Sequence, residues 1–565
     1  LRLRVGIHTG LALAGHVGVK GEYTVIGDTV NIAKRMEESA EPGTLIVSEA
    51  TYQSIRGAFQ VKRLTPVQLL GTKALVNIFQ ILDELQQPTK LRYRTKGGLE
   101  TNLVGRENEM DQLAELYQKT EVNSKPQLVL VPGDVGVGKS RLLFEFAGYL
   151  ETQNPLLTVM ASRALEQTSR VPYALWKELW ANRFELNEDD PLDVTQKKII
   201  DGVRTFWGRT LGDVTAVEAA HFLGSLIGIR WEKSRYLDPF VNNPKSMINR
   251  AYLMLEELFF RASQRGPVVL ILDDLQWADP GSLALIKHLW RSAEQEIPLL
   301  ILSSARSEFL LGEGQDFQEA NRIDLLPLPI NIDIVRDAYP ALRNSPVSML
   351  KILAKKSGGN PYFMEELVKL VLPYGEEAEV VLKKLPDSLD ALLKYRLDSL
   401  SLEGRATAYF AAVAGRVFWK GSVMAAFRGS PGVTKALDVS SHNLVGKVQK
   451  ALDEMMEKEL AFLRVGSVFS GDREYIFKHS RLHQVALSRL PDDFQEKCNL
   501  AVGLWLAERA GPERSICVAQ HFEKAGIIDK AQEFYTLAAE HARSVGCDEE
   551  ADDIQYYART LPEDR

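Results

Sequence analysis

Cysteine is scarce in this sequence: only Cys498, Cys517 and Cys547 occur among 565 residues, and none of them forms a CxxC pair. That spacing argues against a disulfide scaffold or a zinc site and fits a reducing compartment. A run of about 18 apolar residues and a charged-then-apolar leader are also missing, which argues against a membrane span in these residues. We therefore expect a cytoplasmic protein.

A strong excess of charge of either sign is absent as well. The 68 basic and 75 acidic residues give a net charge of −7, which argues against a general nucleic-acid-binding surface. Hydrophobic residues make up 45% and charged residues 25%, the balance of an ordinary globular protein. A chain of 565 residues is too long for one hydrophobic core, so we expect a multidomain protein.

The apolar patterns change several times along the chain. Residues 1–84 read as mixed α and β, and residues 85–100 as a polar linker. Residues 101–330 alternate apolar strands with amphipathic helices, which predicts a parallel α/β sheet. The rest reads mainly as helix, and we divide it into a lid over 331–385, a winged-helix-like region over 386–490 and the start of a helical-repeat (TPR-like) array over 491–565.

The stretch "GDVGVGKS" matches the phosphate-binding pattern GxxxxGK[ST] between a predicted strand, "PQLVLV", and a predicted helix, "RLLFEFAGYLE". Glycines let backbone N–H groups turn around phosphate oxygens, and the helix N-terminus adds its dipole. Lys139 is predicted to reach the β- and γ-phosphates, and the Ser140 hydroxyl to hold Mg²⁺. The predicted nucleotide-binding residues of this stretch are Gly133, Gly136, Gly138, Lys139, Ser140 and Arg141. The alternative is a glycine-rich turn without a ligand.

Two further strands end in polar residues that belong to the same chemistry. "PVVLILDD" ends in Asp273 and Asp274, and ligands collect at the carboxyl ends of strands in open α/β sheets. Asp273 is predicted to join the Mg²⁺ shell and Asp274 to orient or activate the attacking water. "LLILSSAR" ends with Ser304 and Arg306, a polar pair that fits a γ-phosphate sensor. The alternatives are a capping Asp at a strand end and, for Arg306, a surface ion pair.

With these motifs in place, residues 101 to about 380 resemble the ATPase module of the STAND class, a branch of the AAA+ ATPases. "NLVGRENEMDQL", with Gly105 and Arg106, resembles the leader that contacts adenine in that class, and "GGNPYFMEEL" resembles its GxP motif, where Pro361 lies near the base. "PDSLDALLKYRLDSL" and "YIFKHSRLHQVAL" resemble the segments beyond the ATPase. The resemblance implies a slow ATPase that acts as a switch: ADP holds a closed form and ATP permits an open one.

Near the start of the chain, "GDTVNIAKRM" places Asn31 and Arg35 four residues apart, on one face of a predicted helix. Asp28 and Thr29 are capping types at its entry. An apolar stripe toward the core is predicted from Val30, Ala33 and Met36. Taken alone, Asn31 and Arg35 would read as a solvated helix face.

The surrounding string "LRVGIHTGLALAGHVG…EYTVIGDTVNIAKRMEESAEPGTLIVSE" resembles the C-terminal half of a class III nucleotidyl cyclase catalytic domain, as in the soluble adenylyl cyclase group and bacterial cyclase–ATPase fusions. The resemblance implies a ferredoxin-like half-domain in which Asn31 orients the ribose and Arg35 binds the α-phosphate in the transition state. Thr24 matches the position that contacts the purine, which favours adenine. A guanidinium suits this role because negative charge builds on the α-phosphate oxygens as the 3′-hydroxyl attacks.

The resemblance covers only half of that catalytic face. The family's two metal-binding Asp residues and its purine-contacting Lys lie upstream, and residues 1–23 contain no Asp. Family sites form at a dimer interface, so Asn31 and Arg35 are expected to meet the Asp residues of a partner subunit. A start at Leu1, without Met and within a predicted strand, suggests a fragment of a longer protein.

Two functions remain open from the sequence. The first is a signalling enzyme that makes 3′,5′-cyclic AMP and diphosphate from ATP with Mg²⁺ and is regulated by the fused ATPase. The second is an ATP-dependent scaffold or transcriptional regulator with a degenerate cyclase-like dimerisation module. The expected partners are ATP, a second copy of the chain through the cyclase part, and a protein bound by the C-terminal repeats. Nucleic acid is not expected, and the acidic net charge agrees.

Overall fold

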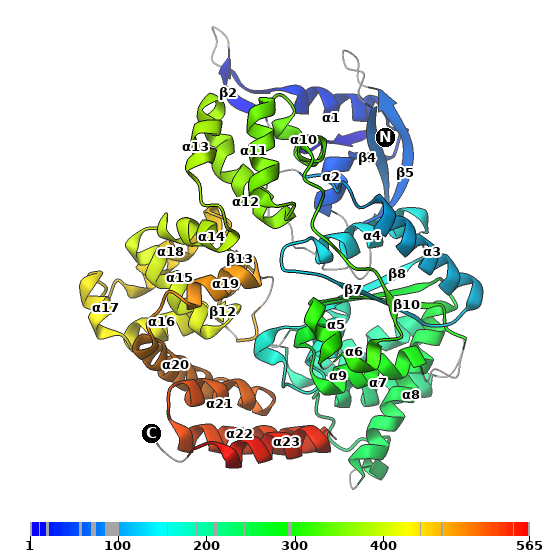
Figure 1. Cartoon of the computed structure of the whole chain (residues 1–565). Helices are drawn as coiled ribbons and strands as arrows, with labels where there is room; N and C mark the ends of the chain where they lie inside the picture. Colours follow the sequence, from blue (N-terminus) through cyan, green and yellow to red (C-terminus); the bar gives the residue numbers. More distant parts are fainter. Residues whose placement is uncertain are drawn as a thin grey trace. The chain divides into compact units, whose positions relative to one another are not determined.

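The structure is a computed structural model of the whole chain, shown in Figure 1. It describes residues 3–10, 12–17, 22–55, 59–68, 75–84, 101–154, 156–187, 190–207, 213–240, 243–291, 296–312, 314–440, 442–464, 467–469, 471–545 and 547–562. The predicted linker over 85–100 lies outside these residues. The chain forms two compact units, Leu1–Gly98 with Phe144–Ala161 and Leu99–Leu143 with Ser162–Arg565.

The first unit contains a four-stranded sheet with the order β1-β4-β6-β5 and a separate β2-β3 hairpin. β1 pairs parallel with β4, whereas β4–β6, β5–β6 and β2–β3 are antiparallel. The elements of the 1–84 segment are β1 (Val5–Ile7), β2 (Leu13–Val17), β3 (Glu22–Ile26), α1 (Asp28–Ser39), β4 (Leu45–Ser48), α2 (Glu49–Ile55), β5 (Phe59–Gln68) and β6 (Leu75–Glu84). The expected mixed α/β character is confirmed.

Helix α1 lies directly against β1 at a glycine. A Cβ on Gly6 would come within 2.2 Å of the backbone nitrogen of Glu37, so no larger residue fits there without displacing the helix. The helix entry differs from the sequence expectation, because Gly27 is the N-cap and no side chain caps α1. The apolar stripe is also narrower than predicted: Met36 is 3% exposed, whereas Val30 is 41% exposed.

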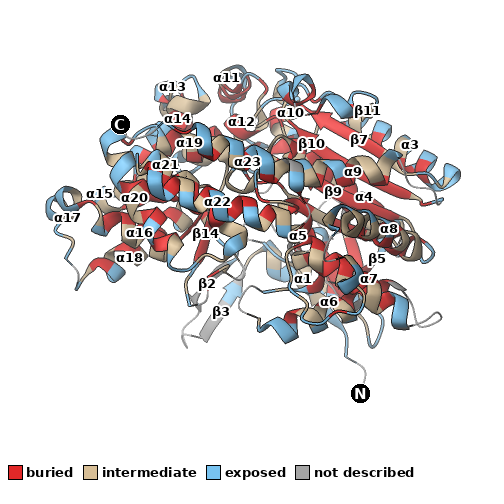
Figure 2. Cartoon of the chain, turned by 90° about the horizontal axis from the view of Figure 1, so that it is seen from below, coloured by how far each residue is buried: buried red, intermediate tan, exposed pale blue. Residues whose placement is uncertain are grey.

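Residues 127–322 contain a five-stranded sheet with the order β11-β7-β10-β9-β8. β10 pairs parallel with both β7 and β9, and β11 pairs parallel with β7, which confirms the predicted parallel sheet. Figure 2 shows the buried character of these strands, and every residue of β9 is buried. The strands are β7 (Gln127–Pro132), β8 (Thr158–Arg163), β9 (Val268–Asp273), β10 (Leu299–Ala305) and the short β11 (Asn321–Arg322), which the sequence analysis missed.

Helices accompany these strands as the alternating pattern predicts. They are α3 (Glu107–Asn123), α4 (Lys139–Gln153), α5 (Ala174–Phe184), α6 (Leu192–Trp207), α7 (Asp213–Leu226), α8 (Pro244–Ser263) and α9 (Pro280–Arg291). A second group of short helices follows the sheet: α10 (Ile332–Ala338), α11 (Val347–Ser357), α12 (Pro361–Val371) and α13 (Ala378–Lys384). Apolar side chains of α10 to α13, among them Leu350, Leu353 and Leu367, form one buried cluster.

Beyond this cluster lies a small antiparallel sheet with the order β12-β14-β13 among helices. The predicted hairpin between "AFLRVG" and "REYIFK" is present as the pairing of β13 with β14. The strands are β12 (Val417–Trp419), β13 (Ala461–Leu463) and β14 (Glu474–Phe477). The helices are α14 (Leu389–Asp398), α15 (Leu402–Ala414), α16 (Lys420–Arg428), α17 (Pro431–Ala436), α18 (Leu444–Glu457), α19 (Ser480–Leu487), α20 (Asp492–Ala507), α21 (Ser515–Lys524), α22 (Ile528–Ser544) and α23 (Asp548–Thr560).

Within the part of the chain that the structure describes, none of the helices combines the length and the apolar character that a membrane crossing requires.

The last helix contacts the start of α9 through a carboxyl group. Glu550 on α23 accepts a hydrogen bond of 2.6 Å from the backbone N–H of Gly281. Burial, together with the nearby Asp279 carboxylate, raises the pKa of Glu550 to about 8. Burial likewise raises the pKa of Asp279 to about 6. Glu550 is therefore mostly protonated in the folded chain at neutral pH.

Raising the pH from about 6.5 to about 8 is expected to weaken the fold through this group. The folded-state pKa lies above that of an unfolded glutamate, so the folded chain holds the extra proton, and stability falls by at most ~1.4 kcal/mol per pH unit as the pH rises. The midpoint of thermal unfolding of the wild-type chain should fall across this window relative to that of Glu550→Gln. Glu540→Gln, at an exposed position of α22, is the control. An unchanged slope in Glu550→Gln would contradict the assignment.

Candidate functional site

The loop between β7 and α4 has the backbone shape of a phosphate cradle. Gly136 and Gly138 adopt positive φ angles of 85° and 100°. These angles suit glycine and turn successive N–H groups toward one side of the loop. A Cβ at Gly138 would meet nothing within 4 Å, so the space beside the loop is open there. Helix α4 begins at Lys139 and points its N-terminus at the same loop.

The side chain of Lys139 folds back over this loop. Its ammonium group donates hydrogen bonds to the carbonyl oxygens of Gly133 at 2.7 Å and Asp134 at 2.8 Å. Burial lowers the pKa of Lys139, and attraction to Asp274 and Asp273 partly offsets that effect. The positive charge therefore lies between the loop and the two acidic residues, where phosphate oxygens would complete its hydrogen bonds.

The two residues predicted to hold a metal ion contact each other. The Ser140 hydroxyl donates to Asp273 Oδ1 at 2.9 Å. The Ser304 hydroxyl donates to the same oxygen and accepts a hydrogen bond of 3.0 Å from the backbone N–H of Asp274. Burial opposes ionisation of Asp273, but Arg163 and the two hydroxyl donors outweigh it and hold its pKa below the ordinary value. Asp273 is thus an ionised carboxylate, the form that binds Mg²⁺.

Asp274 occupies a less common backbone position beside this pair. Its φ angle is 62°, in the left-handed region, where Asp is tolerated better than most residues. Its Oδ1 accepts a hydrogen bond of 3.1 Å from the side-chain amide of Gln276. Its Oδ2 lies 3.6 Å from Arg163 Nε and 3.5 Å from Arg416 Nη1.

Sequence reasoning missed both arginines. Arg163 is the last residue of β8, so the rule that drew attention to Asp273, a polar residue at a strand's carboxyl end, would have found it. Arg416 precedes β12, in a different part of the fold, and no local pattern signals its contact with Asp274.

Residues at the start of α12 also contact the phosphate-binding loop. The side-chain amide of Asn360 donates to Val135 O at 2.9 Å, and the backbone N–H of Tyr362 donates to Gly136 O at 3.2 Å. Pro361, the predicted base-proximal residue, lies between them as the first residue of α12. The quoted "GGNPYFMEEL" stretch therefore contacts the phosphate-binding loop, and the contacts come from residues that flank Pro361.

Arg106, in the predicted leader stretch, contacts the backbone of the phosphate-binding loop. Arg106 is 6% exposed and donates to the carbonyl oxygens of Val137 at 3.0 Å and Leu326 at 2.7 Å. Gly105 adopts a positive φ of 65° immediately before it. These contacts explain why an arginine stands here. A direct contact of Gly105 or Arg106 with adenine stays a prediction.

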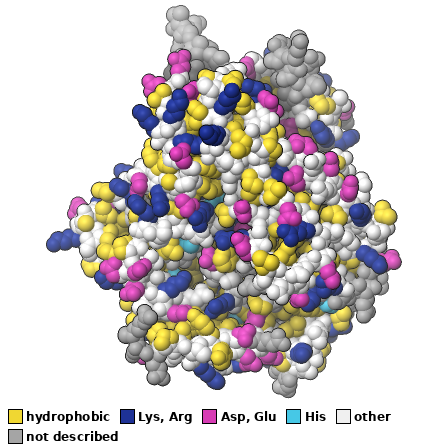
Figure 3. Space-filling model, in the orientation of Figure 1, with side chains coloured by type: hydrophobic (Ala, Val, Ile, Leu, Met, Phe, Trp, Pro, Cys, Tyr) yellow, Lys and Arg dark blue, Asp and Glu magenta, His cyan; other side chains and the backbone are white. Residues whose placement is uncertain are grey.

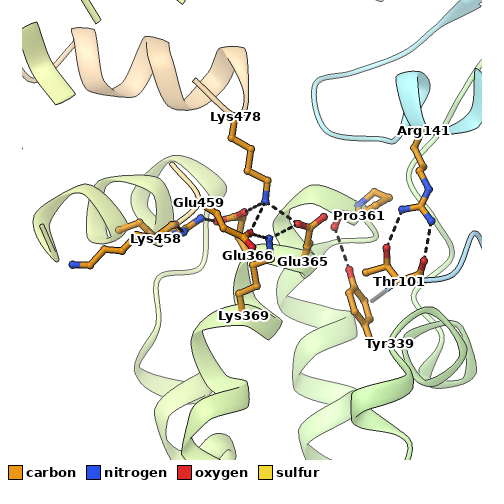
Figure 4. A network of polar contacts seen from close by, with 11 residues as sticks. Thr101, Arg141, Tyr339, Pro361, Glu365, Glu366, Lys369, Lys458, Glu459 and Lys478 are labelled. Carbon is orange, nitrogen blue, oxygen red and sulfur yellow. Dashed lines mark hydrogen bonds and ion pairs between the residues drawn. The ribbon is translucent and has the colours of Figure 1, made fainter. Parts of the chain in front are cut away.

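Arg141 and Arg306 have protein partners of their own. Arg141 donates to the hydroxyl of Thr101 at 2.9 Å and to its carbonyl oxygen at 2.8 Å, as Figure 4 shows. The backbone N–H of Arg306 donates to Gln276 Oε1 at 3.0 Å, and its guanidinium carbon lies 5.3 Å from the centre of the Trp277 ring. Arg306 is partly exposed. A contact between its side chain and the γ-phosphate stays a prediction.

A network of ion pairs joins α12 to the β13–β14 region, and Figure 4 shows it at close range. Lys478 lies 2.8 Å from Glu365 and 3.2 Å from Glu366, and Lys369 lies 2.7 Å from Glu365. Although burial opposes it, attraction to Lys478 and Lys369 lowers the pKa of Glu365. The remaining pairs are Lys369–Glu459, Lys478–Glu459 and Arg396–Glu366. The segment that touches the loop is thereby tied to the small antiparallel sheet.

The candidate residues of the first unit lie on α1 and β3. Asn31 is exposed and Arg35 is partly exposed, one turn apart on α1, as the spacing predicts. Met36 anchors the helix in a cluster with Ile46 and Ile78 and leaves Asn31 and Arg35 accessible. Thr24 belongs to β3, but its side chain lies outside the described residues.

Two protein families match this chain. The family described as "Adenylate and Guanylate cyclase catalytic domain" matches residues 1–83, and the family described as "AAA ATPase domain" matches residues 102–302. These matches confirm the two resemblances found in the sequence. The chain therefore joins a segment similar to a cyclase catalytic domain to a segment similar to an AAA ATPase domain.

Similar proteins match one part of the chain or most of it. An uncharacterised protein of Rhizobium meliloti is 24% identical over 446 residues, which cover 74% of this chain and 40% of that protein. The human atrial natriuretic peptide receptor 2 is 38% identical over 94 residues, which cover 16% of this chain and 9% of the receptor. A guanylate cyclase of Toxoplasma gondii is 41% identical over 58 residues, which cover 10% of this chain and 1% of that protein. The chain thus spans less than half the length of each.

Two solved structures match this chain at low identity and low TM-score. A signal transduction ATPase with numerous domains and a tetratricopeptide repeat sensor, from Pyrococcus horikoshii, is 12% identical, with 84% of this chain and 61% of that chain covered and a TM-score of 0.40. The Aeropyrum pernix ORC1 protein in complex with DNA is 16% identical, with 69% and 93% covered and a TM-score of 0.32. At these TM-scores the likeness carries no inference about what this chain binds.

Proposed function

We propose that this chain is part of a signalling protein that forms 3′,5′-cyclic AMP and diphosphate from ATP and is switched by ATP binding to its fused ATPase domain. One observation carries the proposal. The same chain contains a segment that matches the cyclase catalytic domain and a phosphate-binding loop in which Ser140 contacts Asp273 at 2.9 Å. The chain spans 40% or less of the relatives named above, so the activity of the whole protein is part of the proposal.

In the ATPase domain, the residues fit ATP with Mg²⁺. Lys139 binds the β- and γ-phosphates, and the loop N–H groups around Gly136 and Gly138 bind phosphate oxygens. Hydroxyl and carboxylate oxygens are ligands that Mg²⁺ prefers, so Ser140 and Asp273 hold the ion. When bound, Mg²⁺ neutralises charge on the phosphates.

The residues around this centre complete the proposed site. Asp274 orients the attacking water, and Arg306 turns toward the γ-phosphate. Pro361, with Gly105 and Arg106, lies toward the base. Slow hydrolysis then returns an open, ATP-bound form to a closed, ADP-bound form.

In the cyclase segment, α1 presents the groups that act on the α-phosphate. Arg35 stabilises the negative charge that develops on its oxygens, and Asn31 orients the ribose. Thr24 contacts the purine and favours adenine. The exposure of Asn31 and the partial exposure of Arg35 support roles toward a substrate rather than in the core.

A second copy of the chain is the proposed partner of this segment. Apolar side chains on its surface support a covered face: Ile7 is 41% exposed, Val25 44% and Val30 41%. Protein partners of the C-terminal helices and a cytoplasmic location belong to the same proposal.

The chain by itself is expected to form no cyclic AMP. Two metal ions are needed to activate the 3′-hydroxyl and neutralise the leaving diphosphate, and residues 1–23 contain no Asp to hold them. The purified chain, incubated with ATP and Mg²⁺, should give no product above a buffer blank when cyclic AMP is quantified. The same chain mixed with a cyclase half that supplies the two Asp residues is the positive control. Product from the chain alone would contradict the half-site account.

The second candidate is an ATP-dependent scaffold or transcriptional regulator with a degenerate cyclase part. The cyclase-family match and the presence of both Asn31 and Arg35 favour the cyclase–ATPase fusion. On the face drawn in Figure 3, acidic and basic side chains are interspersed, and that face offers little support for nucleic-acid binding.

A further inference from the structure

We infer that Arg163 and Arg416 hold Asp273 and Asp274 in ion pairs that compete with Mg²⁺, so that metal binding is coupled to the segment that carries Arg416. This makes the two arginines positioning residues of the nucleotide site. The inference deepens the proposed function and rests on its ATP–Mg²⁺ site.

Arg163 contacts both residues that are proposed to hold the metal. Its Nε donates to Asp273 Oδ2 at 2.7 Å, and its Nη2 donates to the same oxygen and lies 3.3 Å from the Ser140 hydroxyl. The side chains of Arg163 and Asp273 are only 10% and 7% exposed. Water screens such a pair poorly, so the attraction is strong, and so is the repulsion between this guanidinium and a divalent cation bound to the same carboxylate.

Arg416 brings a second guanidinium to the same centre from a distant part of the chain. Its Nη1 lies 3.5 Å from Asp274 Oδ2, the oxygen that lies 3.6 Å from Arg163 Nε. Its backbone is fixed in the small sheet, since Phe477 N–H donates to Arg416 O at 2.9 Å. Its side chain is 9% exposed. Arg416 therefore cannot leave Asp274 without moving that sheet or changing its own rotamer.

The charges explain why the two events are coupled. Without metal, the carboxylates of Asp273 and Asp274 already have the guanidinium groups of Arg163 and Arg416 and the ammonium group of Lys139 near them. A Mg²⁺ ion bound to Asp273 adds two positive charges beside Arg163 and weakens the Arg163–Asp273 pair, which shifts Arg163 toward the Asp274 oxygen that it shares with Arg416. Two cations at one oxygen repel each other, so metal binding weakens the Arg416–Asp274 pair. Coupling of this kind is reciprocal, so removing either arginine should strengthen metal binding.

The test compares ATP affinity with and without metal in the full chain. Calorimetric titrations with ATP plus Mg²⁺ and with ATP plus EDTA give a ratio of dissociation constants for each protein. Arg163→Gln should raise the gain in affinity from Mg²⁺ by about tenfold, and Arg416→Gln should raise it by a smaller factor. Arg261→Gln is the matched control: it removes the same charge from an ion pair with Glu257 on α8 and should leave the ratio unchanged.

A second readout follows the small sheet directly. Amide hydrogen exchange of Val417–Trp419 in the wild-type chain should speed up with ATP plus Mg²⁺ and much less with ATP plus EDTA. In Arg416→Gln the exchange should be fast in both conditions. If Arg163→Gln fails to fold, Arg163→Lys, which keeps the charge but loses the two-nitrogen contact, should raise the ratio by a smaller factor.

The outcomes separate this inference from the function on which it rests. A wild-type chain that binds no ATP in either condition contradicts the proposed function itself. The wild-type chain could bind ATP while Mg²⁺ raises the ATP affinity of the Arg163 variants no more than that of the wild-type chain. That result would contradict only the proposed competition between Arg163 and Mg²⁺. Exchange at Val417–Trp419 that ignores Mg²⁺ contradicts the coupling.

Discussion

Lys139→Ala is expected to reduce ATP binding by at least about 100-fold, which corresponds to roughly 2.7 kcal/mol of binding free energy. Its ammonium group lies over the loop, hydrogen-bonded to Gly133 O and Asp134 O, with the Asp273 and Asp274 carboxylates beyond. Without this ammonium group, the triphosphate would lie near two acidic side chains with no cation from the loop to offset their charge. The loss is large because charge-assisted hydrogen bonds are stronger than those from neutral N–H groups. Equilibrium titration with ATP and Mg²⁺ measures the loss.

Two controls make this result specific. Lys383→Ala removes a lysine whose side chain is 59% exposed and whose partner is Glu379 on the same helix, so its ATP affinity should equal that of the wild-type chain. Circular dichroism should show the same helix content in both variants. Equal affinity of Lys139→Ala and the wild-type chain would place the nucleotide elsewhere.

Arg35→Ala, made in a longer protein that carries the two metal-binding Asp residues, is expected to lower the cyclase turnover number by about 100-fold or more. Negative charge grows on the α-phosphate oxygens only as the reaction proceeds, so the guanidinium acts on the transition state more than on bound substrate. The Michaelis constant for ATP should therefore change much less than the turnover number. A steady-state assay of cyclic AMP formation gives both.

The neighbouring residue supplies the matched control for this prediction. Lys34 is exposed on the same helix, and Lys34→Ala removes an equal charge next to Arg35, so it should keep most of the activity. ATP binding at the Lys139 site should be the same in both variants, because the ATPase residues are intact. A normal turnover number in Arg35→Ala would contradict the transition-state role and return Arg35 to a solvated helix face.

Local patterns predicted the framework of this protein well. The apolar runs that became β7, β9 and β10 were visible because buried parallel strands read as continuous hydrophobic stretches. The contact between Ser140 and Asp273 also followed from sequence, since a glycine-rich loop and an acidic strand end converge at one edge of such a sheet.

Contacts between distant segments were not predictable. Nothing near Gly6 indicates that α1 packs against it, because the constraint lies in the backbone of Glu37. The exposure of Val30 was mispredicted for a related reason: helical spacing identifies a face, but the partner element decides how wide the buried stripe is. Arg416 reaches Asp274 only through the tertiary fold, so its role at the site was invisible in the sequence.

A crystal structure of this chain with a non-hydrolysable ATP analogue and Mg²⁺ tests the central claim most directly. The account predicts density for the triphosphate against the loop of Gly133–Ser140, with the ammonium group of Lys139 on its β- and γ-phosphates and a metal ion between Ser140 and Asp273. Clear nucleotide density at another place, with this loop empty and Lys139 still bonded to the carbonyl oxygens of Gly133 and Asp134, would contradict it.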